Sequence, residues 1–219
     1  MKILYEDNHL LVVVKPPGLV TQGADAGEPS LITEAKAYLK RKYQKPGNVY
    51  LGVVSRLDAP VSGVVVLART SKAADRLTKL FRERDVSKSY WAIVAGSPPR
   101  EGELRDWLIK DERVQRVVVT KPQTPGAKEA VLRYRTLGTV NGGTWLEVQL
   151  ITGRKHQIRV QLGSRGWPIL GDHKYGSRAE FASGIALHAR EVEIEHPTTK
   201  ERLTFTADPP SSWKALGLE

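Results

Sequence analysis

The segment VSRLDAPVSGVVVLART, residues 54–70, places Arg56 and Asp58 inside a largely apolar stretch. Its second half, VVVLA at 64–68, is rich in β-branched residues and predicts a buried strand. Its first half, GVVSRLD at 52–58, runs into a turn at APVSG, so we expect Asp58 at the lip of a sheet. A single aspartate beside a turn usually caps that turn. A buried carboxylate, in contrast, requires a partner elsewhere in the chain.

Strands flank this segment on both sides. Residues 2–19 predict two short strands that break at EDNH and stop at the KPPG turn. The stretches AVLRYRTL and TWLEVQLI alternate around GTVNGG and predict an antiparallel hairpin. Further strands are expected at 89–96, 185–197 and 202–207, with the last two paired. The polar, Pro- and Gly-rich region 97–128 is interpreted as an excursion from the core, with one β-branched run at 117–119.

Three helices are expected between the strands. Residues 29–43 have apolar residues at helical spacing, with Ser30 as the N-cap. Residues 71–84 have an apolar stripe and basic residues on the other faces, with Ser71 as the N-cap. A third helix is expected to open within 154–166. The irregular order predicts an α/β (α+β) fold with a mainly antiparallel mixed sheet flanked by helices.

The length and composition limit the number of domains and exclude several classes of protein. A chain of 219 residues is long enough for one core or for two small subdomains around a cleft. The chain has no cysteine, which excludes disulfides and thiolate chemistry. The apolar run at 10–14 is too short for a signal peptide or a membrane span, so we expect a cytoplasmic protein.

The charge balance indicates a polyanionic partner. There are 34 Lys and Arg against 24 Asp and Glu, a net charge of +10, and nucleic acid is the most common polyanion. A generally basic surface that aids solubility is the alternative. Basic clusters lie at 36–45, 69–88 and 110–121. The second lies on a predicted helix and is the best candidate for a surface that faces phosphates, through Lys72, Arg76, Lys79 and Arg82.

Several common sites are absent from the sequence. There is no GxGxxG after a strand, no P-loop, no GxSxG elbow and no HExxH. The five histidines show no i, i+4 ligand spacing, so neither a metal nor another cofactor is predicted. A triad of Ser55, Asp58 and His156 is conceivable, but nothing in the spacing builds an oxyanion hole around Ser55.

Arg159 is the residue that we expect to pair with Asp58. The segment 150–176 is rich in polar donors, yet Arg159 falls among the apolar residues Ile158, Val160 and Leu162. It is therefore expected to face inward, where an arginine needs a carboxylate. We predict that Arg159 pairs with Asp58.

Five segments in the same order resemble the RluA family of RNA pseudouridine synthases. SRLDAPVSGVVVLART is similar to the catalytic motif of that family, HRLDxxTSGLLLLA(K/R)T. The other four, which also resemble family motifs, are ILYEDNHLLVVVKPPGLV, KSYWAIVAG, TGRKHQIRVQL and GWPILGDHKYG. The resemblance extends from about residue 3 to about residue 207. It implies a single catalytic domain over residues 1–219, with two subdomains around a central RNA-binding cleft and without an S4 domain.

The resemblance also implies roles for individual residues. Asp58 matches the catalytic aspartate, either as a nucleophile at C1′ of the ribose or as a base at C2′. Arg56 matches the arginine that fills the gap left by a flipped base. Tyr90 matches the tyrosine that packs on the target base, although a strand tyrosine in a core would look the same. Arg159 matches the arginine that pairs with the catalytic carboxylate.

The implied reaction converts uridine in ribosomal or transfer RNA to pseudouridine without a cofactor. The bond from N1 to the ribose breaks, the uracil turns, and C5 is joined to the ribose. Ile158 and Leu187 lie in apolar segments and are expected to line the pocket. We expect a monomer with no membrane and no obligate protein partner.

The sequence departs from the family pattern at four positions, with Ser55, Val61 and Gln161 in place of His, Thr and His and with Val14 where Asn is common. These departures affect substrate preference and how the loop after Asp58 is held. They are also the only support for an alternative, a catalytically inactive RNA-binding or RNA-folding protein on the same scaffold. A basic DNA-binding module is a third interpretation, but no recognition helix or zinc motif is present.

Overall fold

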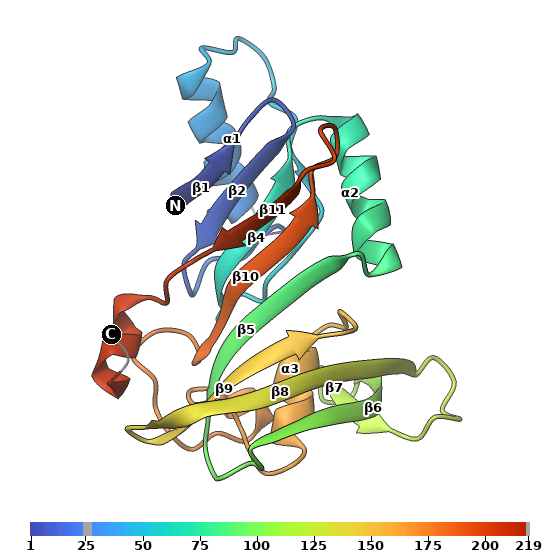
Figure 1. Cartoon of the computed structure of the whole chain (residues 1–219), viewed down its shortest axis with the longest axis vertical. Helices are drawn as coiled ribbons and strands as arrows, with labels where there is room; N and C mark the ends of the chain where they lie inside the picture. The colour runs from blue at the N-terminus through green and yellow to red at the C-terminus, as the bar shows by residue number, and fades with distance from the viewer. Residues whose placement is uncertain (24–27, 218–219) are drawn as a thin grey trace. The chain divides into compact units, whose positions relative to one another are not determined.

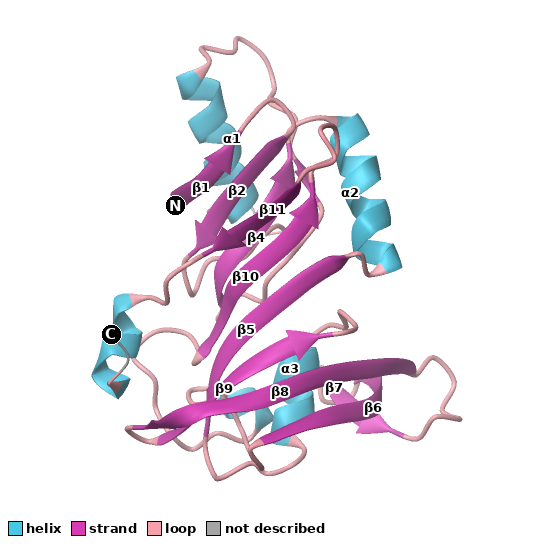
Figure 2. Ribbon diagram, viewed as in Figure 1, coloured by secondary structure: helices cyan, strands magenta, loops and turns pink. Residues whose placement is uncertain are grey.

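The computed structural model describes residues 1–23 and 28–217, which form two compact units. Unit 1 comprises residues 1–88 and 189–209, and unit 2 comprises 89–188 and 210–219. Figure 1 labels the longer elements of both units, and Figure 2 colours the chain by element type. The strand pairings β1–β2, β2–β4, β10–β11, β5–β9, β9–β8, β8–β6 and β6–β7 are all antiparallel. The predicted α+β fold with a mainly antiparallel sheet is confirmed.

The sheet of unit 1 is covered on both faces by helices. Its strands follow the order β1, β2, β4 and β10, with β3 beside β4 and β11 beside β10. The bounds are β1 (Lys2–Glu6), β2 (Leu10–Lys15), β3 (Gly52–Val53), β4 (Ser62–Ala68), β10 (Leu187–Glu195) and β11 (Arg202–Thr206). The helices are α1 (Leu31–Lys42) and α2 (Ser71–Glu83) (Figure 1).

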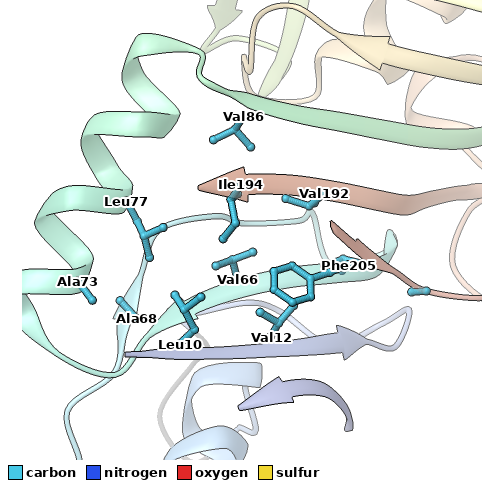
Figure 3. Packing of buried hydrophobic residues seen from close by; sticks show 12 residues of the cluster. Leu10, Val12, Val66, Ala68, Ala73, Leu77, Val86, Val192, Ile194 and Phe205 are labelled. Carbon is cyan, nitrogen blue, oxygen red and sulfur yellow. The ribbon is translucent and has the colours of Figure 1, made fainter. Parts of the chain in front are cut away.

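Coverage on both faces explains why β2 and β4 of unit 1 read as nearly unbroken apolar runs. Leu11 and Val13 of β2 pack in one cluster with Leu31 of α1. Leu10 and Val12 point the other way, into a cluster with Leu77 of α2 that Figure 3 shows in close view. All seven residues of β4 are buried, so the prediction of a buried strand after Asp58 is confirmed.

Two helix starts illustrate local chemistry. Ser30 is the N-cap of α1, and its hydroxyl accepts a hydrogen bond from the Thr33 amide, as predicted. The predicted N-cap of α2 is wrong by one residue. Thr70 has the extended backbone of an N-cap and accepts from the Ala73 amide, so Ser71 is the first helical residue. Either hydroxyl suits a cap, and only the backbone geometry distinguishes them.

Unit 2 is a twisted antiparallel sheet with one short helix against it. The strand order is β5, β9, β8, β6 and β7. The strands are β5 (Val86–Val94), which begins in unit 1, β6 (Glu101–Asp111), β7 (Arg116–Thr120), β8 (Lys128–Val140) and β9 (Gly143–Leu150). The remaining elements are α3 (Gln157–Gly163) and the short 3₁₀ turns η1 (His173–Tyr175) and η2 (Ser211–Leu216). Residues 97–128 therefore contain a long strand, β6, that the interpretation as a polar excursion missed.

Candidate active site

A fully buried lysine holds the loop that carries Asp58. Lys15, the last residue of β2, donates from Nζ to the carbonyl oxygens of Pro16 at 2.8 Å, Leu19 at 2.7 Å and Ala59 at 3.0 Å. Its side chain is inaccessible to solvent. The Gly18 amide also donates to the Ala59 carbonyl at 2.8 Å. The KPPG turn is therefore bonded directly to the residue that follows Asp58.

The residues before Asp58 are held from two sides by hydroxyl groups. Thr21 Oγ1 donates to the Leu57 carbonyl at 2.9 Å and accepts from the Leu57 amide at 3.2 Å. Ser55 Oγ accepts from the Val66 amide of β4 at 2.9 Å and donates to the Val66 carbonyl at 3.3 Å. Both hydroxyls replace strand-like backbone pairing, so the segment after β3 is fixed although it belongs to no strand.

Asp58 itself lies on a turn between β3 and β4 and is half-buried. Its carbonyl accepts from the Val61 amide at 3.0 Å. Burial lowers the pKa of the Lys15 ammonium to about 8, and the negative charge of Asp58 works against this lowering. The carboxylate of Asp58 and the ammonium of Lys15 therefore lie close enough to interact through the low-dielectric interior.

The start of β4 requires glycine at position 63. Gly63 has φ of 122°, and a Cβ there would lie 2.3 Å from the Ala189 carbonyl oxygen of β10. A side chain at this position would push β4 away from β10 and displace the strand that begins four residues after Asp58. The glycine in APVSG is thus required for the close approach of these two strands.

Arg159 faces inward from α3, as predicted. Residues 157–162 are all buried, because this helix has no solvent-facing side, and Arg159 is 6% exposed. Its Nε lies 2.7 Å from Asp172 Oδ2, and its Nη2 lies 2.8 Å from Asp172 Oδ1. The carboxylate that the structure shows on Arg159 is therefore Asp172, and the pairing of Arg159 with Asp58 stays a prediction.

Tyr175 supports the same guanidinium from η1. The Cζ of Arg159 lies 5.0 Å from the centroid of the Tyr175 ring, within the range of a cation–π contact. The Tyr175 hydroxyl is 2.8 Å from His156 Nδ1 and accepts from the Val117 amide at 3.2 Å. His156 is thus bound to Tyr175, and Ser55 is bound to the backbone of β4.

Tyr90 lies on the face of the unit 2 sheet against which α3 packs. Tyr90 is the cross-strand partner of Val148, and Val148 is the partner of Tyr134. Alternation along β8 puts Ala130 on the same face as Tyr134, and Ala130 packs in one cluster with Val160 of α3. Tyr90 is half-buried, so part of the residue stays accessible.

The two apolar pocket candidates are both buried. Ile158 on α3 is 4% exposed, and Leu187 at the start of β10 is 3% exposed. Nothing in these burials distinguishes pocket residues from ordinary core residues, so their role as pocket lining stays a prediction.

The candidate RNA-facing residues lie at the surface. Arg56 is exposed, two residues before Asp58 on the same loop. Lys72, Arg76, Lys79 and Arg82 are all exposed on α2, on faces away from the buried Ala73 and Leu77. Arg76 donates from Nη1 to the Pro197 carbonyl at 2.7 Å, so this residue also joins α2 to the hairpin between β10 and β11.

The other departures from the family pattern have structural roles here. Val61 is 2% exposed and closes the Asp58 turn through its amide. Gln161 is fully buried, and its Nε2 lies 2.7 Å from Asp106 Oδ2 and 3.2 Å from the Leu104 and Ala130 carbonyls. It fastens α3 to β6 and β8. Val14 pairs with Val64 in the sheet of unit 1. None of these residues carries the proposed chemistry.

Lys15, Thr21, Asp172 and Tyr175 are the residues that sequence reasoning missed. Three of them lie in segments that resemble family motifs. Lys15 opens the KPPG turn, and Asp172 and Tyr175 lie in GDHKYG. Those segments supported the family resemblance, but no side chain in them received a role. Thr21 has no comparable signal. Among residues 1–23 and 28–217 no cluster of His, Asp and Glu suited to a metal is found, and no helix is long and apolar enough to cross a membrane.

Comparison with known proteins decides the family. A family model described as RNA pseudouridylate synthase matches residues 9–164, which include Asp58, Tyr90 and Arg159. The chain belongs to this family.

Relatives of this synthase cover nearly all of it. The dual-specificity RNA pseudouridine synthase RluA of Haemophilus influenzae is 36% identical over 217 residues, which span 94% of this chain and 92% of that protein. The ribosomal large subunit pseudouridine synthase D of Vibrio cholerae is 33% identical over 233 residues, which span 100% of this chain and 70% of that protein. An uncharacterized RNA pseudouridine synthase of Synechocystis is 33% identical, over 99% of this chain and 68% of that protein.

Solved structures agree with the sequence relatives. The human protein RNA Pseudouridylate Synthase Domain Containing 4 superposes with a TM-score of 0.82 at 28% identity, over 100% of this chain and 94% of that one. Human RNA Pseudouridylate Synthase Domain Containing 1 gives a TM-score of 0.75 at 23% identity, over 95% of this chain and 83% of that one, which shows the shared fold. The synthase fold is therefore confirmed.

The function follows from this membership. The chain is an RNA pseudouridine synthase, an isomerase that converts uridine in RNA to pseudouridine. The resemblance to the RluA family is confirmed. The alternative of an inactive RNA-binding protein on the same scaffold finds no support in these comparisons, and neither does a DNA-binding module.

Proposed function

We propose that Asp58, Tyr90 and Arg159 are the catalytic residues of this synthase and that its substrate is a stem-loop of ribosomal or transfer RNA. Ribosomal RNA is supported by a relative named for the ribosomal large subunit, and another relative is named for dual specificity. Transfer RNA is the second class that the family resemblance implies. The observation that carries the assignment of Asp58 is the way its loop is built. A buried ammonium and a threonine hydroxyl fix the backbone on both sides of a half-buried carboxylate.

Such rigidity suits a carboxylate that must react at one specific atom of a ribose. Catalysis gains from groups that are oriented before the substrate arrives, since a displacement of about 1 Å can cost about 10²-fold in rate. Asp58 acts on the ribose of a uridine that has left the base stack, either at C1′ or at C2′. Extrusion of the nucleotide costs a few kcal/mol, which contacts between RNA and the enzyme must offset.

The remaining assignments divide between base and backbone. Tyr90 packs on the uracil, and it takes the proton that C5 loses when the new bond forms. Arg56, exposed beside Asp58, fills the gap in the RNA left by the flipped base. Ile158 and Leu187 line the apolar part of the pocket. The exposed cations of α2, namely Lys72, Arg76, Lys79 and Arg82, contact phosphates.

Other predictions accompany this proposal. We infer one catalytic domain that acts as a monomer, without an obligate protein partner, in the cytoplasm. The reaction requires no cofactor, because bond cleavage and bond formation involve the same two fragments and no net oxidation.

Release of tritium from C5 tests the assignment of Asp58. Transcripts of transfer RNA and of ribosomal RNA made with [5-³H]uridine are incubated separately with wild type, with Asp58→Asn and with Asp85→Asn. Asp85 is a surface carboxylate paired with Arg202, so its variant controls for loss of one negative charge in unit 1.

The expected result is release by wild type and by Asp85→Asn, and none by Asp58→Asn, which still binds RNA. The transcript that releases tritium identifies the RNA class. Turnover by Asp58→Asn at more than a few per cent of the wild-type rate would overturn its catalytic role.

A further inference from the structure

The guanidinium of Arg159 is held by two residues of one short turn. Asp172 binds it through both carboxylate oxygens, at 2.7 Å to Nε and 2.8 Å to Nη2. Tyr175 lies under it, with the ring centroid 5.0 Å from Cζ. The Tyr175 amide donates to the Asp172 carbonyl at 3.0 Å, so η1 fixes the two side chains relative to each other.

This turn is itself anchored at two further points. The Tyr175 hydroxyl binds His156 Nδ1 at 2.8 Å and the Val117 amide at 3.2 Å. Lys174 Nζ donates to the Gln115 carbonyl at 2.8 Å. Residue 156 is the N-cap of α3, while Val117 and Gln115 belong to the hairpin of β6 and β7. The turn is therefore connected both to the helix that bears Arg159 and to a neighbouring hairpin.

We propose that Asp172 and Tyr175 are positioning residues that fix the plane and direction of the Arg159 guanidinium for the isomerisation. The proposal rests on the catalytic role of Arg159 given above. A bidentate pair on the Nε and Nη2 side leaves one orientation of the planar fork. That orientation directs the Nη1 end away from Asp172, and Nη1 is the end with which Arg159 can bind a second carboxylate.

The charge of the pair supports the same role. Arg159 and Asp172 are 7% and 1% exposed at their side chains, and together they carry no net charge. Arg159 thus offers a second carboxylate directed hydrogen bonds without an unbalanced positive charge. Such an arrangement orients a reactive carboxylate while the pair itself adds little positive charge, which suits either a nucleophile or a base.

A second pair in unit 2 provides a matched control. Arg165 binds Asp106 through both oxygens, at 2.9 and 3.1 Å, from the residues just after α3. It has the same chemistry and also ties the helix region to its surroundings, but Arg165 has no proposed catalytic role. Asp106 also accepts from Gln161 Nε2 at 2.7 Å, so Asp106→Asn reports what the loss of buried contacts to this helix region does to folding and to kcat while Arg159 keeps its own partner.

The experiment compares Asp172→Asn and Asp106→Asn for melting temperature, RNA affinity, KM and kcat, with tritium release from C5 as the assay. Both variants are expected to lower the melting temperature. Only Asp172→Asn is expected to lower kcat, by about 10²-fold, with KM and RNA affinity within about twofold of wild type. Asp172→Glu, which keeps the charge, should restore part of the loss.

Two further variants separate positioning from folding. In an Arg159→Lys background, Asp172→Asn should change kcat by less than about twofold, because lysine has no fork to orient. Tyr175→Phe keeps the ring and removes the hydroxyl, and it should lower kcat by about 3- to 10-fold. It tests the proposal even where Asp172→Asn does not fold.

The proposal is overturned by wild-type kcat in Asp172→Asn, by an equal loss of kcat in Asp106→Asn, or by an undiminished effect of Asp172→Asn in the Arg159→Lys background. Failure of the proposed function looks different. In that case Asp58→Asn would retain turnover, whatever the Asp172 variants do.

Discussion

The ammonium nitrogen of Lys15 lies 3.0 Å from the carbonyl oxygen of Ala59, the residue that follows Asp58. This single contact joins the end of β2 to the proposed catalytic loop across 44 positions of sequence. The hydrogen bonds described for Lys15 all go to carbonyl oxygens. A buried charge held by backbone oxygens costs folding free energy, and its position beneath the loop explains why the chain retains it.

The first prediction concerns the pH dependence of stability. Burial lowers the pKa of Lys15 to about 8 from an ordinary value of 10.5. Between these two pH values the unfolded chain keeps a proton that the folded chain has lost. The free energy of unfolding of wild type should therefore rise relative to that of Lys15→Met, by about 3 kcal/mol over this range, and stay level below pH 8.

Urea denaturation of both proteins from about pH 6.5 to about pH 11.5 measures this difference, since the range brackets both pKa values. Titrations common to the two proteins cancel, since only residue 15 differs. A difference that stays constant across the range, or that falls with pH, would show that Lys15 is not buried as a charged group.

The second prediction concerns the hydroxyl that holds the other side of the loop. Thr21→Val removes both hydrogen bonds to the Leu57 backbone, at 2.9 and 3.2 Å. Because Leu57 immediately precedes Asp58, we expect kcat to fall at least about tenfold, with a loss of about 1–3 kcal/mol in stability.

Thr206→Val is the control for this change. Thr206 lies exposed on β11, and its hydroxyl binds only Glu191 among the contacts described. Its variant should leave both kcat and the melting temperature close to wild type. Equal effects of the two substitutions would remove any special role for Thr21.

The third prediction concerns Arg159. Arg159→Ala leaves Asp172 buried without its cation, and breaking such a pair costs about 3–5 kcal/mol. Chemical denaturation should show this loss together with loss of turnover. Asp172→Asn added to Arg159→Ala should recover part of the stability and none of the activity, because it removes the stranded charge but not the cause of inactivity.

An exposed arginine gives the comparison. Arg133 pairs with Glu103 on the surface of β8 with its side chain 63% exposed, and Arg133→Ala should cost less than about 1 kcal/mol.

The proposed pairing of Arg159 with Asp58 is tested by a separate measurement. A double-mutant cycle of Asp58→Asn and Arg159→Lys on RNA-free stability should give a coupling energy above about 0.5 kcal/mol, and a sum that is simply additive would contradict the pairing.

The fold was largely predictable because its strands and helices carry local signals. The run at 64–68 is buried on both faces, and EDNH and KPPG mark the ends of β1 and β2. The strand β6 was missed because Arg105 and Asp106 interrupt its apolar positions and Pro and Gly precede it. Its surface charges are satisfied by cross-strand partners such as Glu129, 2.5 Å from Arg105, and partners of this kind cannot be read from one strand alone.

The candidate site was predictable only in part, for a related reason. The inward direction of Arg159 followed from its apolar neighbours and is confirmed by its burial. The burial argument called for a carboxylate but could not select one, and Asp172 lies 13 residues away in a turn with no periodic pattern. Lys15 was overlooked because a lysine after an apolar strand ordinarily marks the point where the chain reaches solvent.

The fourth prediction concerns Arg56. Because Arg56 is exposed, Arg56→Ala should leave the melting temperature unchanged. Its proposed place is inside the RNA, where it discourages return of the flipped base, so kcat/KM should fall by about 10- to 100-fold, equivalent to about 1.4–2.7 kcal/mol. Fluorescence of 2-aminopurine next to the target uridine reports flipping directly. If the fluorescence with Arg56→Ala is as high as with wild type, Arg56 does not fill the gap that the flipped base leaves in the RNA.

The last prediction concerns the basic face of α2. Lys72, Lys79 and Arg82 are exposed, and replacing all three with Gln should weaken RNA binding while leaving kcat at saturating RNA unchanged. Arg76 is left intact because its bond to the Pro197 carbonyl would confound the result with folding. Each phosphate contact that is lost should reduce the slope of log K against log salt by about 0.7–0.9.

The control removes the same number of positive charges elsewhere. It combines substitutions of Lys2, Lys110 and Arg113, three exposed cations outside α2. If the slope decreases equally in both triple variants, the protein attracts RNA by its net charge alone and α2 is not a defined contact. If the slope decreases only in the α2 variant, the RNA phosphates bind at this helix.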